Sequence, residues 1–321
     1  MDNISNSLLD DNLKEIKRKN EKYAYICAII TQFLWAINSI QLKTYKQYFP
    51  KQFSLNSLVF WRSIPIWFIG YIVVKKKNAT IPSLNEIQYK FWFHMRNVGN
   101  YVGVLFWILL LNYFRVSTGQ CCANCHPIVI LILSAIILKE KFYMRYLIGV
   151  LLSLFGTFLI ISNENKNNDS SNQNLENKSL LVGCLIAIIH LTILSFVVFA
   201  QKYLCMENLT GEIQNYYLGM FNSLPALFLM MIENHYGLSN PLYCLYGMSN
   251  GVVFSIANYC QTEALNYMPI NRFMPITYLN IVFIFILGFL FFGEKIYLTD
   301  IIGSLMILGF QIFNIVIPIK K

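Results

Sequence analysis

Polar side chains lie at helical spacing inside otherwise apolar stretches of this 321-residue chain, and they are its best candidates for chemistry. Arg96 and Asn100 lie four positions apart in one stretch, and Asn258 and Gln261 lie three positions apart in another. Such spacings place side chains on one face of a helix. A polar or charged group at membrane depth is costly, and it usually faces a partner or a water-filled cavity. These residues therefore predict a binding cavity, or, alternatively, hydrogen bonds that only join neighbouring helices.

Six further side chains complete the set of candidate cavity residues: Arg62, Asn124, His126, His190, Tyr278 and Asn280. Arg62 and Arg96 each lie about two helical turns from a helix end, so each could instead snorkel to the membrane surface. Asn124 and His126 precede Pro127, and this pattern predicts either a locally opened helix or a simple kink. His190 fits a proton relay or a structural hydrogen bond.

The run from Cys122 to His126 spells C-x-x-C-H, the pattern of covalent haem attachment. It begins an apolar stretch with no nearby aqueous loop for an attachment enzyme, so we interpret these cysteines as small packing thiols rather than as haem or zinc ligands. No phosphate-binding loop, dinucleotide fingerprint or metalloprotease helix is present. We expect no catalytic residue, no metal site and no cofactor, and we do not expect an enzyme.

The elements that must position these residues are membrane helices. The chain is 56% hydrophobic, 16% aromatic and only 13% charged, a composition typical of an all-α integral membrane protein. With about 20 apolar residues per span, ten segments are expected: roughly 23–43, 55–74, 91–113, 118–138, 146–162, 180–203, 213–233, 242–264, 272–292 and 299–318. The net charge of +9 comes from basic residues scattered at segment ends, so no nucleic-acid partner is expected.

An internal repeat divides these ten helices into two halves. A shift of 154 residues superposes Asn112–Gly149 on Asn266–Gly303 with ten identities over 38 ungapped positions. Five helices per half is an odd number, so the second half enters the membrane from the opposite side, which predicts an inverted 5+5 repeat. The expected divisions are a polar tail at 1–22, a first five-helix repeat at 23–162, a polar linker at 163–179, a second five-helix repeat at 180–318, and a tail at 319–321.

Orientation follows from the basic residues, which accumulate on the cytoplasmic side of membrane proteins. With the amino terminus inside, the inside loops and tails hold sixteen lysines and arginines and the outside loops hold seven. We therefore expect both termini to be cytoplasmic. No cleavable signal is visible, so the first apolar helix should act as the membrane signal. The sequence does not distinguish the plasma membrane from an endomembrane.

Several short motifs extend this reading to a family. They are Phe60-Trp61-Arg62-Ser63, Arg96-Asn97-Val98-Gly99, the stretch from Asn112-Tyr113 to His126-Pro127, Leu138-Lys139-Glu140-Lys141, and Phe292-Gly293-Glu294-Lys295 before Ile302-Gly303. Together with the ten segments they resemble the drug/metabolite transporter superfamily, and within it the EamA-like family. The resemblance implies a secondary carrier or exchanger of small metabolites, built as an inverted five-plus-five bundle around a central cavity.

The leading hypothesis is therefore an alternating-access carrier of a small polar metabolite. Arg62 and Arg96 favour an anionic or zwitterionic substrate. Two alternatives stay open: a membrane-embedded enzyme that uses the histidine and cysteine groups, and a non-transporting scaffold or sensor with the carrier fold. The expected partners are the lipid bilayer and the small-molecule substrate, and a second copy of the chain, forming a homodimer, is a further candidate.

Overall fold

The computed structural model describes residues 2–49, 54–113, 126–139, 178–234 and 240–292, with short pieces at 144, 147–152, 155–156, 298–299, 301–303, 305–306 and 309. The side chains of residues 2–18 and 178–181 are not described. Most of the expected fifth and tenth segments, the linker and the carboxyl-terminal tail lie outside the described residues, and so does the candidate Asn124.

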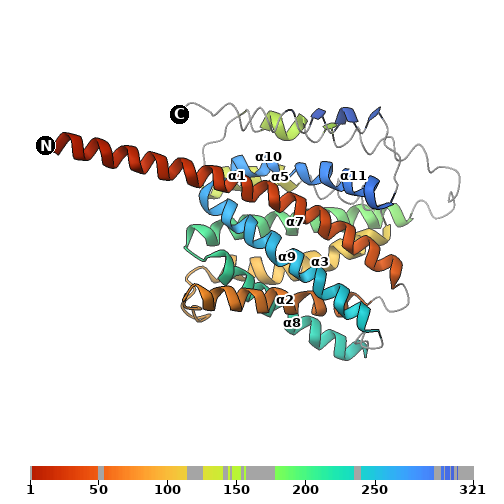
Figure 1. Ribbon diagram of the computed structural model, residues 1–321. Coiled ribbons are helices and arrows are strands. Elements are labelled where there is room, and N and C mark those ends of the chain that lie inside the picture. The colour runs from red at the N-terminus through yellow and green to blue at the C-terminus, as the bar shows by residue number, and fades with distance from the viewer. Residues whose placement is uncertain are drawn as a thin grey trace.

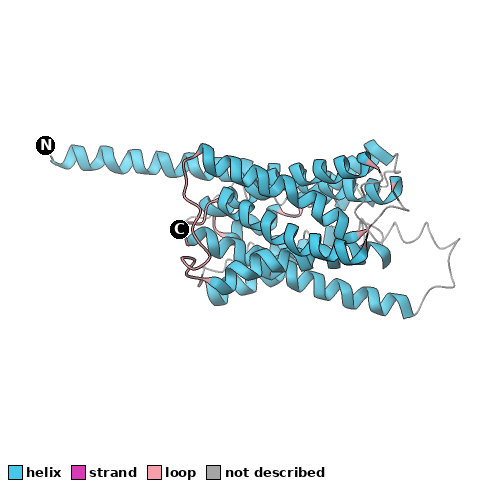
Figure 2. Cartoon of the chain, turned by 90° about the horizontal axis from the view of Figure 1, so that it is seen from below, coloured by secondary structure: helices cyan, strands magenta, loops and turns pink. Residues whose placement is uncertain are grey.

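Every regular element in the described ranges is a helix, which confirms the expected all-α class. The helices are α1 (Asp2–Tyr48), α2 (Leu55–Lys76), α3 (Lys90–Tyr113), α5 (His126–Ile137), α7 (Lys178–Met206), α8 (Gly211–Glu233), α9 (Pro241–Tyr267), α10 (Ile270–Ile276) and α11 (Leu279–Phe292). The long helices lie side by side in both views, and the amino-terminal part of α1 projects beyond them (Figures 1 and 2). The stretch 1–22, expected as a polar tail, thus continues the first helix from Asp2 onward.

Four helices among the described residues are long and apolar enough to cross a membrane. They are Lys19–Leu42, Leu55–Lys76, Val182–Met206 and Ile270–Phe291. Large apolar side chains such as Phe68, Phe228 and Leu290 lie 63–67% exposed on the outside of the bundle. Exposed apolar surface of this extent is what a lipid-facing exterior requires.

Helices α2 and α8 pack against each other in antiparallel directions (Figure 1). Near the start of α2, Asn56 Nδ2 donates to Glu233 Oε1, at the end of α8, over 2.5 Å. Beyond the end of α2, Lys77 Nζ lies 3.2 Å from Glu212 Oε2, at the start of α8. Partial burial alone would lower the pKa of Lys77, but hydrogen bonds to Tyr259 and Glu212 outweigh it, so the pKa is raised.

Two glycines allow the backbones of α2 and α8 to touch. A Cβ atom on Gly70 would lie 2.5 Å from the backbone nitrogen of Tyr216, and a Cβ atom on Gly219 would overlap the backbone of Trp67. Real Cβ atoms essentially never come closer than 3.0 Å to such neighbours. The contact is therefore reciprocal, with one glycine from each helix fitting against the backbone of the other.

A second antiparallel pair joins α1 to α9. Thr31 Oγ1 donates to the carbonyl of Ala257 over 3.4 Å, and farther along α1 the ring of Tyr45 lies 4.8 Å from that of Tyr243. The third pair joins α3 to α7, where the ring of Trp92 lies 5.1 Å from that of Phe199. The contact of His190 on α7 with Gly103 on α3 lies farther along this pair, so in each pair the residue numbers rise along one helix as they fall along the other.

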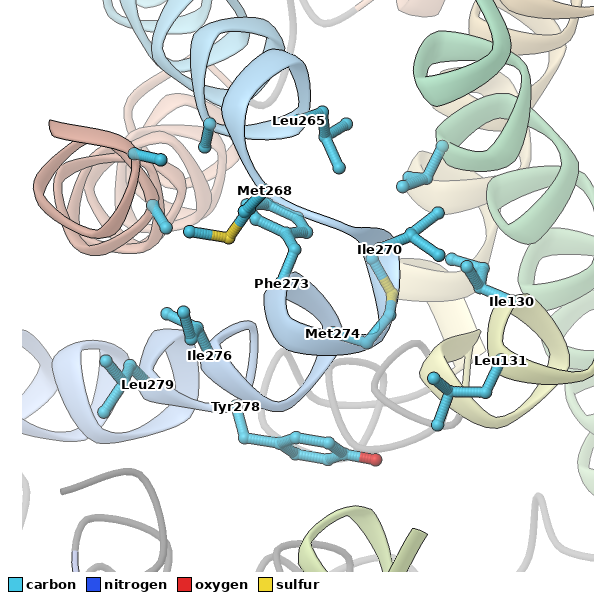
Figure 3. Packing of buried hydrophobic residues seen from close by; sticks show 14 of the residues in the cluster. Ile130, Leu131, Leu265, Met268, Ile270, Phe273, Met274, Ile276, Tyr278 and Leu279 are labelled. Atoms are coloured by element: carbon cyan, nitrogen blue, oxygen red, sulfur yellow. The ribbon is translucent and has the colours of Figure 1, made fainter. Parts of the chain in front are cut away.

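The expected ninth segment is interrupted, because α10 ends at Ile276 and α11 begins at Leu279. Pro275 lies in the last turn of α10, where its ring and missing N–H disturb a continuing helix. Around α10, an apolar cluster includes Phe273 and Met274 together with Ile130 and Leu131 from α5 (Figure 3). This cluster fixes the break between α10 and α11 beside the interior of the bundle.

Candidate substrate-binding cavity

A cavity of about 180 Å³ lies inside the bundle, with walls from α1, α2, α3, α5, α7, α9, α10 and the start of α11. At roughly 30 Å³ per water molecule, it has the volume of about six waters. Eight of the ten residues that the sequence nominated line it: Arg62, Arg96, Asn100, His126, His190, Asn258, Gln261 and Asn280. Their substrate-binding role stays a prediction, but the structure brings them to one place.

The face of α3 that the sequence spacing selected forms one wall. Arg96, Asn100, Val104 and Trp107 all line the cavity. Asn100 is held across the bundle, because Asn222 Nδ2 of α8 donates to its Oδ1 over 3.1 Å. These four residues, which helical spacing places on one face, thus lie on the cavity side of α3.

Arg96 is the most deeply placed charge on the wall, with only 2% of its surface exposed. Its Nη2 donates to Oδ1 of Asn258 on α9, and Nδ2 of Asn258 donates in turn to Oδ1 of Asn215 on α8. Asn215 Nδ2 donates to the carbonyl of Ser255 over 2.9 Å. This chain of amides fixes the guanidinium in the interior and rules out the alternative that Arg96 snorkels to the surface.

Arg62 is also buried, at 5% exposure, but is held in a different way. Its guanidinium carbon lies 3.9 Å from the ring centroid of Phe254 on α9, a cation–π contact. Phe254 is itself fixed by an edge-to-face contact with Trp35, with centroids 4.8 Å apart. No hydrogen bond or ion pair joins Arg62 to any residue that the structure describes. The snorkelling alternative fails here too, since the head group lies inside the bundle.

A second amide network connects α1, α7 and α9. Trp35 Nε1 donates to Gln261 Oε1 over 2.9 Å, and Gln261 Nε2 donates to Gln201 Oε1 over 3.0 Å. Gln201 Nε2 donates to Thr262 Oγ1 over 2.7 Å. The polar groups of this wall are oriented by one another, so their positions are preset before any ligand enters.

Two histidines line the same cavity. His190 is 5% exposed, its Nδ1 lies 3.0 Å from the carbonyl of Gly103, and its ring lies 5.4 Å from that of Trp107. A carbonyl only accepts, so Nδ1 carries the proton and Nε2 of the neutral ring is left as an acceptor. His126 is the first residue of α5 and is 8% exposed.

The break between α10 and α11 contributes Thr277 and Asn280 to the wall. Asn280 Nδ2 donates to the carbonyl of Gln32 over 3.0 Å. Tyr278, which the sequence also nominated, does not line the cavity; it is fully buried in the apolar cluster around α10 (Figure 3). The break rotates the chain here, so residues on either side of Tyr278 face the cavity while Tyr278 packs among apolar neighbours.

Sequence reasoning missed several wall residues on α1 and α7, namely Gln32, Trp35, Asn38 and Gln201. The same signal could have found the three amides, because each interrupts an apolar run. Among the described residues, no group of three or more His, Cys, Asp or Glu side chains could hold a metal ion. Cys122 and Cys125 of the C-x-x-C-H pattern lie outside the described residues.

Comparisons with known proteins give the fold and the family. No curated protein matches the chain. One solved structure, titled only "Crystal structure of protein", is similar with a TM-score of 0.71 and 14% sequence identity, over 90% of this chain and 96% of that chain. The family model described as "EamA-like transporter family" matches twice, at residues 22–162 and 181–315. The chain is therefore an integral multi-pass membrane protein that belongs to the EamA-like transporter family.

Proposed function

We propose that this protein is a secondary transporter that moves a small polar metabolite by alternating access around the buried cavity. The observation that carries this proposal is the cavity itself. Helices from both family-matched halves meet there, and they present two arginines and several preset amides to a volume of about 180 Å³. That volume is well below the range of roughly 300–1,000 Å³ typical of drug-sized pockets, which favours a small metabolite as the cargo.

The pattern of helix pairing supports an inverted repeat of five plus five helices, with repeats at 23–162 and 180–318. In such a repeat, α1, α2 and α3 of the first half correspond to α7, α8 and α9 of the second half. The pair α1–α9 then corresponds to the pair α7–α3. Both pairs are present, and both are antiparallel. The remaining pair, α2–α8, should map onto itself and run antiparallel only if the repeats are inverted. Its end-to-end contacts run antiparallel.

The mechanism follows from this arrangement. The two halves would rock about the α2–α8 contact, so that the cavity opens to one side of the membrane and then to the other. A substrate drives this exchange only through its different affinity for the two states. The distribution of basic residues supports an orientation with both termini in the cytoplasm.

Uptake by purified protein in proteoliposomes tests transport and separates a carrier from a scaffold or sensor. Arg96→Gln should remove most of the uptake, because the variant keeps an amide donor and loses the charge. Arg96→Lys should restore only part of it, since lysine lacks the planar donor array that engages Asn258. Lys75→Gln, an exposed change at the end of α2, is the control and should transport normally. Normal uptake by Arg96→Gln would remove the cavity from the transport pathway.

A further inference from the structure

Two guanidinium groups converge on one face of α9. Arg62 from α2 stacks on Phe254, and Arg96 from α3 binds Asn258. Phe254 and Asn258 are four residues apart on α9, so they lie about 5–6 Å apart on the same side of the helix. The two cations therefore approach the cavity about one helical turn from each other.

Neither cation has a counterion among the residues that the structure describes. The described residues of the cavity wall include no aspartate or glutamate, and among them the other titratable side chains are His126 and His190. Among the described residues, no carboxylate lies within ion-pair distance of Arg62 or Arg96. An arginine does not lose its proton in proteins, and burying an unpaired ion is strongly unfavourable. Two such charges, side by side, require compensation from something that enters the cavity.

The unused donors point to the same conclusion. Arg62 makes no hydrogen bond to any described residue, although its guanidinium offers five N–H donors. Because Phe254 covers one flat face of that group, the donors at its edge stay free. Nη2 of Arg96 donates to Asn258, and the buried Nε of Arg96 has no partner among the described atoms. Free, preset guanidinium edges are suited to bidentate recognition of carboxylate or phosphate oxygens.

We propose that the ligand of this cavity is a small dianion, whose two negative charges are held by Arg62 and Arg96. This inference rests on the proposed function, because it names the substrate class of the same site. A monoanion would leave one buried charge uncompensated, whereas a dianion neutralises both in an environment where apolar walls strengthen the attraction. A volume of about 180 Å³ can accommodate a four- or five-carbon dicarboxylate or a small phosphate anion.

A charge-matched series of probes tests the proposal by binding alone. Purified protein in detergent is titrated with succinate, with its monoamide and with its diamide, which have nearly the same size and carry two, one and no negative charges. Inorganic phosphate is a fourth probe, which distinguishes a dicarboxylate site from a phosphate site. We expect succinate or phosphate to raise the thermal midpoint, because a ligand of the folded state stabilises it. Succinate, or phosphate, should bind at least tenfold more tightly than the monoamide.

Variants assign the two charges to the two arginines. Arg62→Gln and Arg96→Gln should each reduce the preference for the dianion over the monoamide to within about threefold, since each removes one of the paired charges. Lys75→Gln, which removes an exposed cation from the same helix as Arg62, should keep the full preference. If one arginine variant fails to fold, the other variant and the probe series on the native protein still test the proposal.

The outcomes separate this inference from the proposed function. Equal binding of succinate, monoamide and diamide, or no binding of either succinate or phosphate, would overturn the dianion proposal. A preference for the dianion over the monoamide that persists unchanged in both arginine variants would also overturn the proposal. A dianion preference in detergent without uptake in vesicles would sustain the binding class and refute transport. Uptake of a neutral or cationic solute, without binding of any dianion, would sustain transport and refute the dianion proposal.

Discussion

Replacing Gly70 by alanine should destabilise the bundle, because this glycine sets the distance between α2 and α8. The added Cβ would lie 2.5 Å from the backbone nitrogen of Tyr216 and 2.8 Å from its Cα, whereas ordinary contacts begin at 3.4 Å. The obstacle is backbone in the middle of a helix, so it cannot rotate away. The helices must separate locally by 0.9 Å, the difference between 3.4 and 2.5 Å. Overpacking typically costs 1–3 kcal/mol, against a gain of about 1 kcal/mol in helix propensity.

We therefore expect Gly70→Ala to lower the apparent thermal midpoint of the purified protein by several degrees, measured at one scan rate because membrane proteins often unfold irreversibly. Gly103→Ala is the matched control in α3. Its Cβ would lie 3.4 Å from a flexible methyl group of Ile193, an ordinary contact, so that variant should be neutral or slightly more stable. A Gly70→Ala protein as stable as the native one, or a loss of equal size in Gly103→Ala, would refute the close α2–α8 approach.

Three further substitutions should have measurable effects. Lys202→Met removes a buried ammonium that donates to the carbonyls of Leu265 and Met268 over 2.6 and 3.0 Å; we expect a loss of about 1–3 kcal/mol, seen as a lower thermal midpoint, and no change would contradict the bond. Asn258→Leu deprives Arg96 of its acceptor and should reduce stability by a similar amount, whereas a stabilised variant would show that the amide is dispensable. Phe254→Leu removes the ring beneath Arg62, and this cation–π contact is worth about 0.5–2 kcal/mol. Phosphate or succinate should then bind several-fold more weakly by calorimetry. Unchanged affinity would count against that contact.

The inward face of α3 could be predicted from the sequence, because polar residues in a membrane helix are costly unless they face the interior. That rule placed Arg96 and Asn100 on the cavity wall, and on α9 it placed Asn258 and Gln261 there as well. Whether Arg62 faced the interior or the surface could not be predicted. That depended on the contact with Phe254, which a different helix supplies across the bundle.

The rest of the wall depends on tertiary contacts that no local pattern encodes. The break between α10 and α11 turns Thr277 and Asn280 toward the cavity and buries Tyr278 among apolar side chains, although the sequence named Tyr278 as a candidate cavity residue. Pro275 disturbs the helix near this point, but the position of the break also depends on packing against α5. On α1, Gln32 joins the site because its carbonyl accepts from Asn280.

Two-sided accessibility of Asn100 tests alternating access most directly. In a background with the native cysteines replaced, Asn100→Cys should react with a membrane-impermeant thiol reagent added to either face of sealed, oriented vesicles. A cysteine at Ile108, which is 3% exposed on the same helix and packs in an apolar cluster, is the control and should react from neither face. Addition of the dianion that binds most tightly should slow the labelling of Asn100→Cys. Labelling from both faces, blocked by ligand, is the predicted result; labelling from only one face under all conditions would contradict alternating access.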